Sequence, residues 1–295
     1  MNLPVIDPLD KRLNAFNENI ADSRLRKDVK SAKYVDGLPA QIVAPCVDMR
    51  RVPDLKTGID TQLLLGQSVQ VFERRDGFAW VQAKLDGYVG WVEEKCLSDD
   101  ISIFTHRVLV GRSFVYPGPD LRFPRAKTLS MGSLVKVAGE AETRGTQYAV
   151  LASGEGMIAS HLCPIDEYET DYVSVAERLI GTPYLWGGNS GFGIDCSGLI
   201  QIAMMMCEQK VLRDSDMQTA TLGSPIEPGE SFENLQRGDL IFWRGHAAIA
   251  QGDGLMVHAS GHSMTVTSEL LKEAIERIAY IYERPIAFKR LKSGP

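Results

Sequence analysis

One cysteine of this sequence has a setting that suits covalent chemistry. Cys196 follows a glycine-rich stretch, TPYLWGGNSGFGID over residues 182–195, and opens a segment whose apolar residues recur at helical spacing. The partial positive charge and free N–H groups at a helix start would lower the pKa of a thiol and could hold an oxyanion. The polar neighbours Asp195 and Ser197 argue against an inert apolar niche. Cys196 is therefore the predicted nucleophile, and the other four cysteines are expected to be structural.

A nucleophilic cysteine needs a base, and the base needs a group that orients it. Of the five histidines, His246 begins a strand-like run and His258 lies within the next run. Two neighbouring strands can place these rings side by side, with His246 toward the thiol and His258 against its other ring nitrogen. This pattern predicts acyl transfer from Cys196 with His246 as the base. The remaining histidines are expected in structural or loop positions.

A zinc site is the rival use of Cys196, His246 and His258. The short ligand spacings of zinc sites are missing from the sequence, so no metal and no other cofactor is predicted. The five cysteines are odd in number, widely scattered and without a CxxC pair. A disulfide scaffold is therefore not expected either.

The elements around these residues follow an α+β pattern, in which a helix that carries the cysteine precedes strands that carry the histidines. Asp171 is a candidate N-cap for the first helix, which Gly181 ends. We expect helices over 172–180 and 196–208, strands over 239–243, 246–251 and 255–259, a helix that starts at Ser268, and a closing strand over 279–283.

The first half of the chain contains an internal repeat. Residues 63–97 and 129–162 both read L-x-x-G-x-x-V-x-V, then a polar turn, then alternating apolar residues and a final short strand. Short alternating strands with glycine-rich turns predict two small β-barrels in tandem. Residues 10–30 have apolar positions at helical spacing, so residues 1–35 are expected to form an N-terminal arm or helix.

The ordered motifs of the second half resemble the NlpC family of bacterial cell-wall cysteine peptidases. They are TPYLWGG (182–188), DCSGL (195–199), RDSDMQ (213–218), GDLIFW (238–243), GHAAIA (245–250) and MVHAS (256–260). The two repeats resemble bacterial SH3-like domains. The resemblance implies an α+β, papain-like peptidase domain over 166–295, preceded by SH3-like barrels over 36–100 and 101–165.

The sequence resembles most the subgroup of γ-D-glutamyl-L-diamino acid endopeptidases. That resemblance implies cleavage between γ-D-glutamate and diaminopimelate or lysine in murein peptides with a free N-terminal L-alanine, as in cell-wall peptide recycling. It makes Cys196 the nucleophile, His246 the base and His258 the third catalytic residue, with Tyr184 beside them. The residues implied in binding the alanine amine are Asp60 (in IDTQ), Tyr88 (in GYVGW), Asp195, Ser197 and Ser215, with Arg213 and Asp214 next to them.

One position departs from the pattern of that subgroup. Glu is expected where Asp60 stands, so the carboxylate is one methylene shorter and a water could bridge it to the amine. From the sequence alone, Arg213, Asp214 and Ser215 are expected in a solvated loop that caps a helix. The second repeat ends in GMIASHL, lacks the GY-x-GW motif, and is expected to be architectural.

Composition and charge limit the possible binding partners and the cellular location. The net charge of −6 argues against nucleic acid or an anionic membrane as partner, because both favour a basic surface. No apolar run has the length of a signal peptide or membrane span, so a cytoplasmic location is expected. Two rival functions stay open: another thiol acyl-transfer enzyme, such as a muramoyl-L-alanine amidase or an acyltransferase, or a non-catalytic protein that binds wall peptides. The preference for diaminopimelate or lysine and the oligomeric state also stay open.

Overall fold

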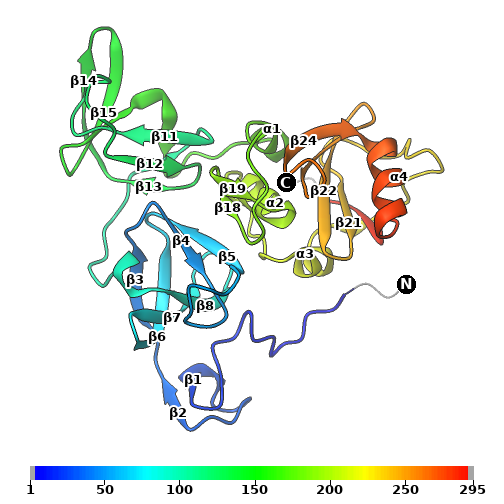
Figure 1. The fold of residues 1–295 in the computed structure, drawn as a ribbon, viewed down its shortest axis with the longest axis horizontal. Coiled ribbons are helices and arrows are strands. Elements are labelled where there is room, and N and C mark those ends of the chain that lie inside the picture. The colour runs from blue at the N-terminus through cyan, green and yellow to red at the C-terminus, as the bar shows by residue number, and fades with distance from the viewer. Residues whose placement is uncertain (1–3, 292–295) are drawn as a thin grey trace. The chain divides into compact units, whose positions relative to one another are not determined.

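The computed structural model describes residues 4–291, which divide into two compact units. One unit spans residues 9–168, and the other comprises residues 169–291 together with 4–8. Both are drawn in Figure 1. No helix within residues 4–291 is long and apolar enough to cross a membrane.

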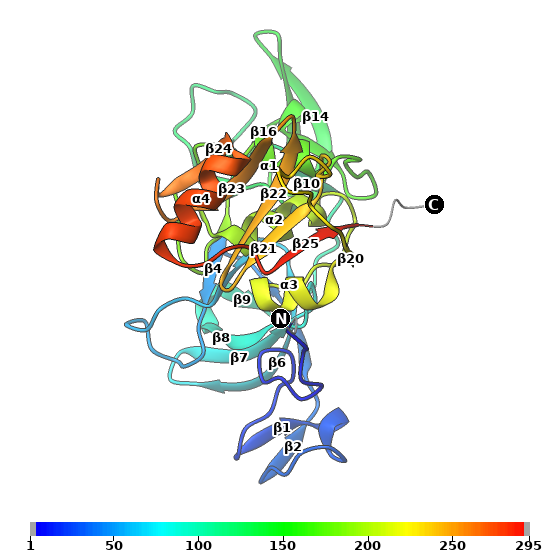
Figure 2. The same cartoon turned by 90° about the vertical axis from the view of Figure 1, so that its right-hand side faces the viewer.

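The C-terminal unit is built on a six-stranded antiparallel sheet with the order β20-β25-β21-β22-β23-β24. Helix α2 (Cys196–Met205) lies on one face of this sheet and α4 (Leu271–Ile281) on the other (Figures 1 and 2). The strands are β20 (Ser224–Pro225), β21 (Leu240–Trp243), β22 (His246–Gly252), β23 (Leu255–Ser260), β24 (Thr265–Leu270) and β25 (Ala287–Arg290). The unit also contains α1 (Tyr172–Glu177), β18 (Asn189–Ser190), β19 (Gly193–Ile194) and α3 (Ser215–Thr221).

Alternation along the central strands decides which side chains meet which helix. Met256 of β23 packs in one buried cluster with Leu271, Ala274 and Ile275 of α4. Side chains two residues apart on a strand share a face, so His258 lies on the α4 side of the sheet as well. This placement lets a side chain of α4 approach the histidines.

The main elements of this unit were predicted from the sequence, with two errors near its end. Asp171 caps α1 as expected, because its side chain accepts a hydrogen bond from the N–H of Val173. The helix expected to start at Ser268 exists, but its predicted start is wrong, because β24 continues to Leu270 and α4 begins only at Leu271. Residues 279–281 belong to α4 rather than to a strand, and the closing strand is β25.

The physical reason lies in two patterns that overlap in sequence. Thr265, Val266 and Thr267 are β-branched and favour the extended edge strand that pairs with β23. From Leu271 onward, apolar residues recur at positions 271, 274, 275 and 278, which gives α4 one apolar stripe. The helix therefore keeps its register through residues that, read alone, favour a strand.

The first barrel of the N-terminal unit has a five-stranded sheet, β8-β7-β6-β3-β9, and a hairpin, β4-β5. Backbone hydrogen bonds in both directions between Arg50 and Trp91 join the hairpin to β8. Its core includes Phe72, Trp80 and Trp91. The strands are β3 (Leu38–Ile42), β4 (Cys46–Met49), β5 (Thr61–Leu64), β6 (Ser68–Arg75), β7 (Phe78–Ala83), β8 (Val89–Glu93) and β9 (Leu97–Ser98).

The second barrel repeats this order. Its first strand again pairs with its last (β10-β17), a hairpin follows (β11-β12), and a three-stranded meander completes it (β14-β15-β16). Gly66 and Gly132, the matching glycines of the repeat, both have positive φ (86° and 85°), a conformation that glycine adopts at low cost. The strands are β10 (His106–Val108), β11 (Arg112–Val115), β12 (Lys127–Ser130), β13 (Leu134–Val135), β14 (Val137–Thr143), β15 (Thr146–Leu151), β16 (Gly156–Ile158) and β17 (Leu162–Pro164).

Residues 10–30 contain no α-helix, which corrects the helical pattern seen in the sequence. Short polar side chains bind the backbone nearby instead: Asp10 accepts from the N–H of Arg12, and Asn17 from the N–H of Ile20. Such local bonds compete with helix formation. The segment forms turns, a 3₁₀ turn and a parallel pair of short strands, β1 (Ile20–Asp22) and β2 (Lys33–Val35).

Candidate active site

Cys196 is the first residue of α2, and the N-cap residue Asp195 fixes the backbone around it. The Asp195 carboxylate accepts hydrogen bonds from the N–H groups of Gly198 (2.7 Å) and Gly187 (3.0 Å). Gly198 must be small, because a Cβ there would lie 2.5 Å from the carbonyl oxygen of Gly188. The turn that leads into α2 is thus tied both to the cap and to the glycines before it.

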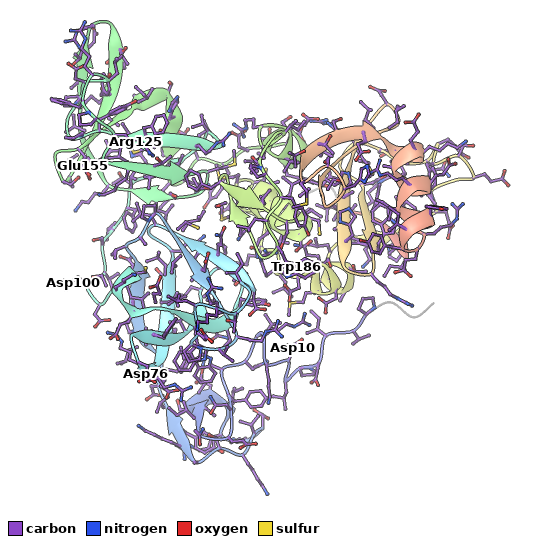
Figure 3. The ribbon with its side chains drawn as sticks, in the orientation of Figure 1. Asp10, Asp76, Asp100, Arg125, Glu155 and Trp186 are labelled. Atoms are coloured by element: carbon purple, nitrogen blue, oxygen red, sulfur yellow. The ribbon has the colours of Figure 1, made fainter. Side chains whose placement is uncertain are left out.

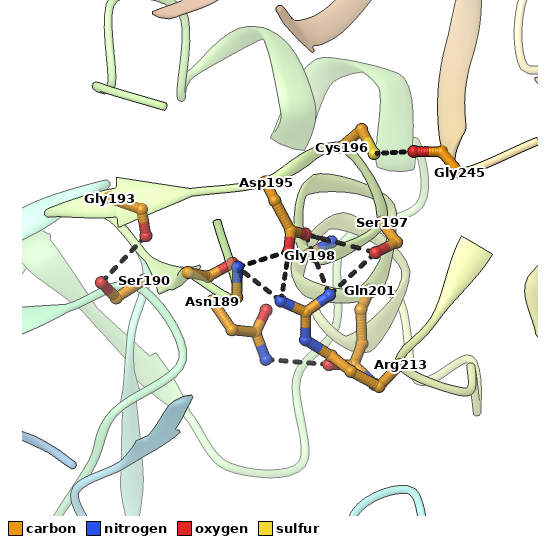
Figure 4. A network of polar contacts seen from close by, with 12 residues as sticks. Asn189, Ser190, Gly193, Asp195, Cys196, Ser197, Gly198, Gln201, Arg213 and Gly245 are labelled. Atoms are coloured by element: carbon orange, nitrogen blue, oxygen red, sulfur yellow. Dashed lines mark hydrogen bonds and ion pairs between the residues drawn. The ribbon is translucent and has the colours of Figure 1, made fainter. Parts of the chain in front are cut away.

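The thiol of Cys196 meets the strand that carries His246. Its Sγ lies 3.9 Å from the carbonyl oxygen of Gly245 (Figure 4) and accepts a hydrogen bond from the N–H of Ala247. These two residues flank His246, the first residue of β22. The backbone on both sides of the predicted base therefore contacts the predicted nucleophile, while proton transfer between the two side chains stays a prediction.

The expected lowering of the Cys196 pKa is wrong for the free protein. Burial, followed by the negative charge of Asp195, raises the pKa of Cys196 to about 12, and the N–H groups of Ala247 and Ser197 offset this only in part. Burial also lowers the pKa of His246 to about 3. At neutral pH the Cys196 thiol and the His246 imidazole are thus both uncharged.

The two predicted histidines form a direct contact. His246 Nε2 lies 2.8 Å from His258 Nδ1, with the ring planes inclined by 70°. His258 is buried in β23, and the ring of Trp243 lies 5.3 Å from the His246 ring. Because His258 occupies Nε2, Nδ1 is the ring nitrogen of His246 that remains for a proton of the thiol.

Glu269 and Arg277 were not predicted from the sequence. They continue the row of polar contacts that begins with His246 and His258. His258 Nε2 lies 2.8 Å from Glu269 Oε1, and Arg277 binds both oxygens of that carboxylate. His258 pairs with Thr267 across the sheet, so Glu269, two residues further along β24, lies diagonally from it on the same face. The expected helix start at Ser268 hid this register.

A cavity of about 470 Å³ opens beside the histidine pair. Tyr184 lines it, and burial together with the nearby Cys196 raises the pKa of its hydroxyl above the usual range. Trp186, labelled in Figure 3, also lines the cavity and is 70% exposed. Further lining residues are Arg244, His262, Ile278, Tyr282 and Glu283. Tyr184 is therefore near the thiol, as expected, and His262 lies in a turn that borders the same cavity.

The solvated loop expected at Arg213–Ser215 is wrong. Arg213 is only 1% exposed, and its guanidinium donates to both oxygens of Asp195 (2.9 and 2.7 Å) and to Ser197 Oγ (2.8 Å), as Figure 4 shows. Asp214 precedes α3, and Ser215 is its first, buried residue. The network supports the turn beneath Cys196, while contact between these residues and a substrate stays a prediction.

The remaining predicted binding residues, Asp60 and Tyr88, belong to the N-terminal unit. Asp60 immediately precedes β5 and accepts a hydrogen bond from Arg51 at 2.6 Å, so its charge already has a partner. Tyr88 immediately precedes β8 and is 5% exposed. Their participation in substrate binding stays a prediction.

Comparison with known proteins agrees with this geometry. Residues 181–282, which hold Cys196 and both histidines, match the family model described as NlpC/P60 family. This chain carries an NlpC/P60 domain. Residues 49–97 match the model described as bacterial dipeptidyl-peptidase Sh3 domain. The prediction of a papain-like domain preceded by an SH3-like, β-rich region is confirmed.

Curated relatives cover most of the chain. It is 29% identical over 251 residues to dipeptidyl-peptidase 6 of Lysinibacillus sphaericus. This match covers 78% of the chain and 91% of the relative. It is 28% identical over 230 residues to gamma-D-glutamyl-L-lysine dipeptidyl-peptidase of Bacillus cereus, with 68% of this chain and 67% of the relative covered. The crystal structure of an NlpC/P60 family protein from Bacillus cereus shares the fold, with a TM-score of 0.70 and 22% identity over 85% of this chain and 99% of that one.

The family and the geometry together identify the chain as a cysteine peptidase of the cell-wall type, which acts on a peptide. The non-catalytic alternative is thereby set aside. Within residues 4–291, no three His, Cys, Asp or Glu side chains are grouped so that they could hold a metal ion.

Proposed function

We propose that the chain hydrolyses the bond between γ-D-glutamate and diaminopimelate or lysine in murein peptides that begin with a free L-alanine. The observation that carries the proposal is the contact of Cys196 Sγ with the backbone next to His246, together with the His246–His258 contact at the edge of the cavity that Tyr184 borders. The relatives named gamma-D-glutamyl-L-lysine dipeptidyl-peptidase support the choice of bond.

The reaction we propose is acyl transfer through a thioester. Because thiol and imidazole are both neutral in the free protein, His246 Nδ1 takes the proton from Cys196 as the sulfur attacks the γ-glutamyl carbonyl. Backbone N–H groups at the start of α2 hold the oxyanion, and the hydroxyl of Tyr184 supports them. His246 then gives its proton to the leaving amine, and later removes a proton from the water that hydrolyses the thioester.

The position of the base decides where each half of the peptide lies. The leaving amine must reach His246, so we expect the diamino acid to occupy the cavity that His246 and Tyr184 border. Arg244 and Glu283 line the same cavity and supply both signs of charge. Diaminopimelate carries an ammonium and a carboxylate at its far end, and lysine an ammonium alone, so both fit this lining.

We also propose that the free amine of L-alanine is recognised by the carboxylate of Asp60, with Tyr88 beside it. An ammonium removed from water needs a compensating negative charge. Murein peptides still joined to the glycan have no free alanine amine, so this requirement would restrict the enzyme to released peptides. A role in peptide recycling and a cytoplasmic location are consistent with such a substrate and stay predictions.

The deciding experiment compares L-Ala-γ-D-Glu-diaminopimelate with the same peptide acetylated on alanine, with products identified by mass spectrometry. We expect cleavage of the free peptide alone, between glutamate and diaminopimelate. Equal cleavage of both peptides would contradict amine recognition. Cleavage before the alanine of a muramoyl peptide would instead establish an amidase.

A further inference from the structure

The histidine pair of the active site ends on a half-buried carboxylate. His246, His258 and Glu269 come from three adjacent strands, β22, β23 and β24, and each contact measures 2.8 Å. The three side chains follow one diagonal across the α4 face of the sheet. Arg277 of α4 binds both oxygens of Glu269 from the other side.

We propose that Glu269, held by Arg277, is a positioning residue that sets the tautomers of both histidines and so gives His246 Nδ1 its free lone pair. The inference rests on the proposed function, because it assigns the origin of the basic nitrogen that the reaction uses. Neither the family comparison nor the sequence motifs assign a role to Glu269.

The tautomers follow from the hydrogen-bond donors and acceptors of Glu269, His258 and His246, taken in that order. An ionised carboxylate only accepts hydrogen bonds, so His258 Nε2 must carry a proton and donate it to Glu269. We infer that His258 is the neutral tautomer, so that its other nitrogen, Nδ1, is an acceptor; a His258 protonated on both nitrogens would reverse this count. His246 Nε2 must therefore carry the proton of the contact between the rings, which leaves His246 Nδ1 unprotonated.

The charge state of Glu269 supports the first step of this count. The hydrogen bond from His258, with that from Arg277, lowers the pKa of Glu269 to about 2 although burial opposes this shift. Arg277 has donors only and binds both carboxylate oxygens, so it keeps the carboxylate ionised and in place. The carboxylate thus remains an acceptor throughout the pH range in which the enzyme would work.

The same arrangement balances charge during the reaction. When Cys196 gives its proton to His246 Nδ1, the ring becomes an imidazolium that keeps its Nε2–H bond to His258. The thiolate forms the new bond to the carbonyl carbon, and the Nδ1 proton later goes to the leaving amine. Glu269 places a negative charge on the far side of His258 from His246. This charge stabilises the His246 imidazolium without taking a proton from it.

The test reads the tautomers directly, by ¹⁵N NMR of histidine-labelled full-length protein at neutral pH without substrate. For the wild type we expect His246 protonated on Nε2 and unprotonated on Nδ1, and His258 protonated on Nε2. In Glu269→Gln the amide donates as well as accepts, so we expect mixed tautomers at both rings. Arg277→Met should keep the wild-type tautomers, because Glu269 still accepts from His258.

Kinetics on the murein peptide provide the second readout. Loss of the correct tautomer in a serine-protease triad lowers kcat about 10⁴-fold, so a mixed population in Glu269→Gln should lower kcat by about 10-fold or more. KM should change little, because Glu269 acts through His258. Glu269→Asp keeps an acceptor and should restore part of the activity. The matched control is Glu177→Gln, which removes the carboxylate that pairs with Arg237 at 2.9 Å in the same unit.

The outcomes separate this inference from the proposed function. A wild-type His246 protonated on Nδ1, or wild-type tautomers and an unchanged kcat in Glu269→Gln, would overturn the inference. The expected tautomers in a protein that cleaves no murein peptide would support the inference and reject the proposed function. Thermal unfolding of each variant shows whether it is folded, and Glu269→Asp keeps the test decisive if Glu269→Gln is not folded.

Discussion

Arg213 binds both carboxylate oxygens of Asp195, at 2.9 and 2.7 Å, at the turn that leads into Cys196. The Arg213 side chain is 1% exposed and that of Asp195 12%, so neither charge has much access to water. A buried ion pair of this kind is costly to break, because the remaining partner is left as an unpaired buried charge. The pair is therefore a structural requirement of the nucleophile's turn.

We predict that Arg213→Met lowers the free energy of unfolding by ~3–5 kcal/mol, since it leaves Asp195 unpaired. Urea unfolding followed by circular dichroism measures this change. The matched control is Arg178→Met, which removes an ion pair with Glu169 of similar length (2.8 Å) at the surface of the same unit. That change should cost at most ~1 kcal/mol. Equal decreases in the free energy of unfolding of the two variants would show that the buried pair stabilises the fold no more than the surface pair.

Cys196→Ala should abolish peptide hydrolysis and leave the protein folded, because the sulfur forms the acyl-enzyme. Cys207→Ala is the matched control. Cys207 is a half-buried thiol of the same unit, and burial raises its pKa to about 11, but it does not contact the histidine pair. Turnover should be kept in this variant. Mass spectrometry of the acyl-enzyme, trapped at short times, should place the adduct on Cys196 alone.

The pH dependence of alkylation tests the neutral resting state. Burial raises the pKa of Cys196 to about 12, so its rate of reaction with iodoacetamide should keep rising with pH beyond about 9, the ordinary pKa of a thiol. A thiol activated by the helix start would instead reach a plateau near neutral pH. Such a plateau would contradict a neutral pair and restore the expectation drawn from the sequence.

Burial of neutral His246 predicts a loss of stability in mild acid. The pKa of His246 falls from 6.5 to about 3 on folding, through burial and the nearby His258 and Arg277, while Glu269 acts in the opposite direction. Below about pH 6.5 the unfolded chain binds a proton that the folded protein does not, so stability is present above that pH and lost as pH falls. The slope should approach ~1.4 kcal/mol per pH unit.

His246→Gln should remove this slope between about pH 6.5 and 4.5, above the range in which Glu269 starts to contribute. Urea unfolding at several pH values measures it. The control is His262→Gln, because His262 is exposed in a turn. An unchanged slope in His246→Gln would mean that another group takes up the proton.

The pairing of Asp60 with Arg51 gives a specific test of amine recognition. If Asp60 binds the alanine amine, Asp60→Asn should lower kcat/KM about 10-fold or more through KM, as expected when a charge-assisted hydrogen bond is lost. Arg51→Ala should have the opposite effect, because Arg51, 81% exposed, competes for the same carboxylate. Unchanged KM values in both variants would exclude Asp60 from substrate binding.

Local patterns in the sequence determined most of the scaffold and predicted the two histidines that contact each other. The repeat of residues 63–97 in 129–162 predicted two barrels, and its matching glycines, Gly66 and Gly132, both lie in turns with positive φ. The glycine-rich stretch before Cys196 and the helical spacing after it predicted the start of α2, and the strand-like runs predicted His246 and His258 on neighbouring strands. These features depend on residues close in sequence, so spacing alone was enough to find them.

Only the tertiary structure decided the charge state of the site and the residues that support it. The pKa of Cys196 depends on burial by elements distant in sequence, which outweighs the effect of the helix start. Arg213 pairs with Asp195 across 18 residues of sequence. Glu269 reaches His258 because of the register of β24, an edge strand whose last three residues were predicted to begin a helix. Burial and register arise from contacts between distant segments, and the spacing of residues along one segment does not encode them.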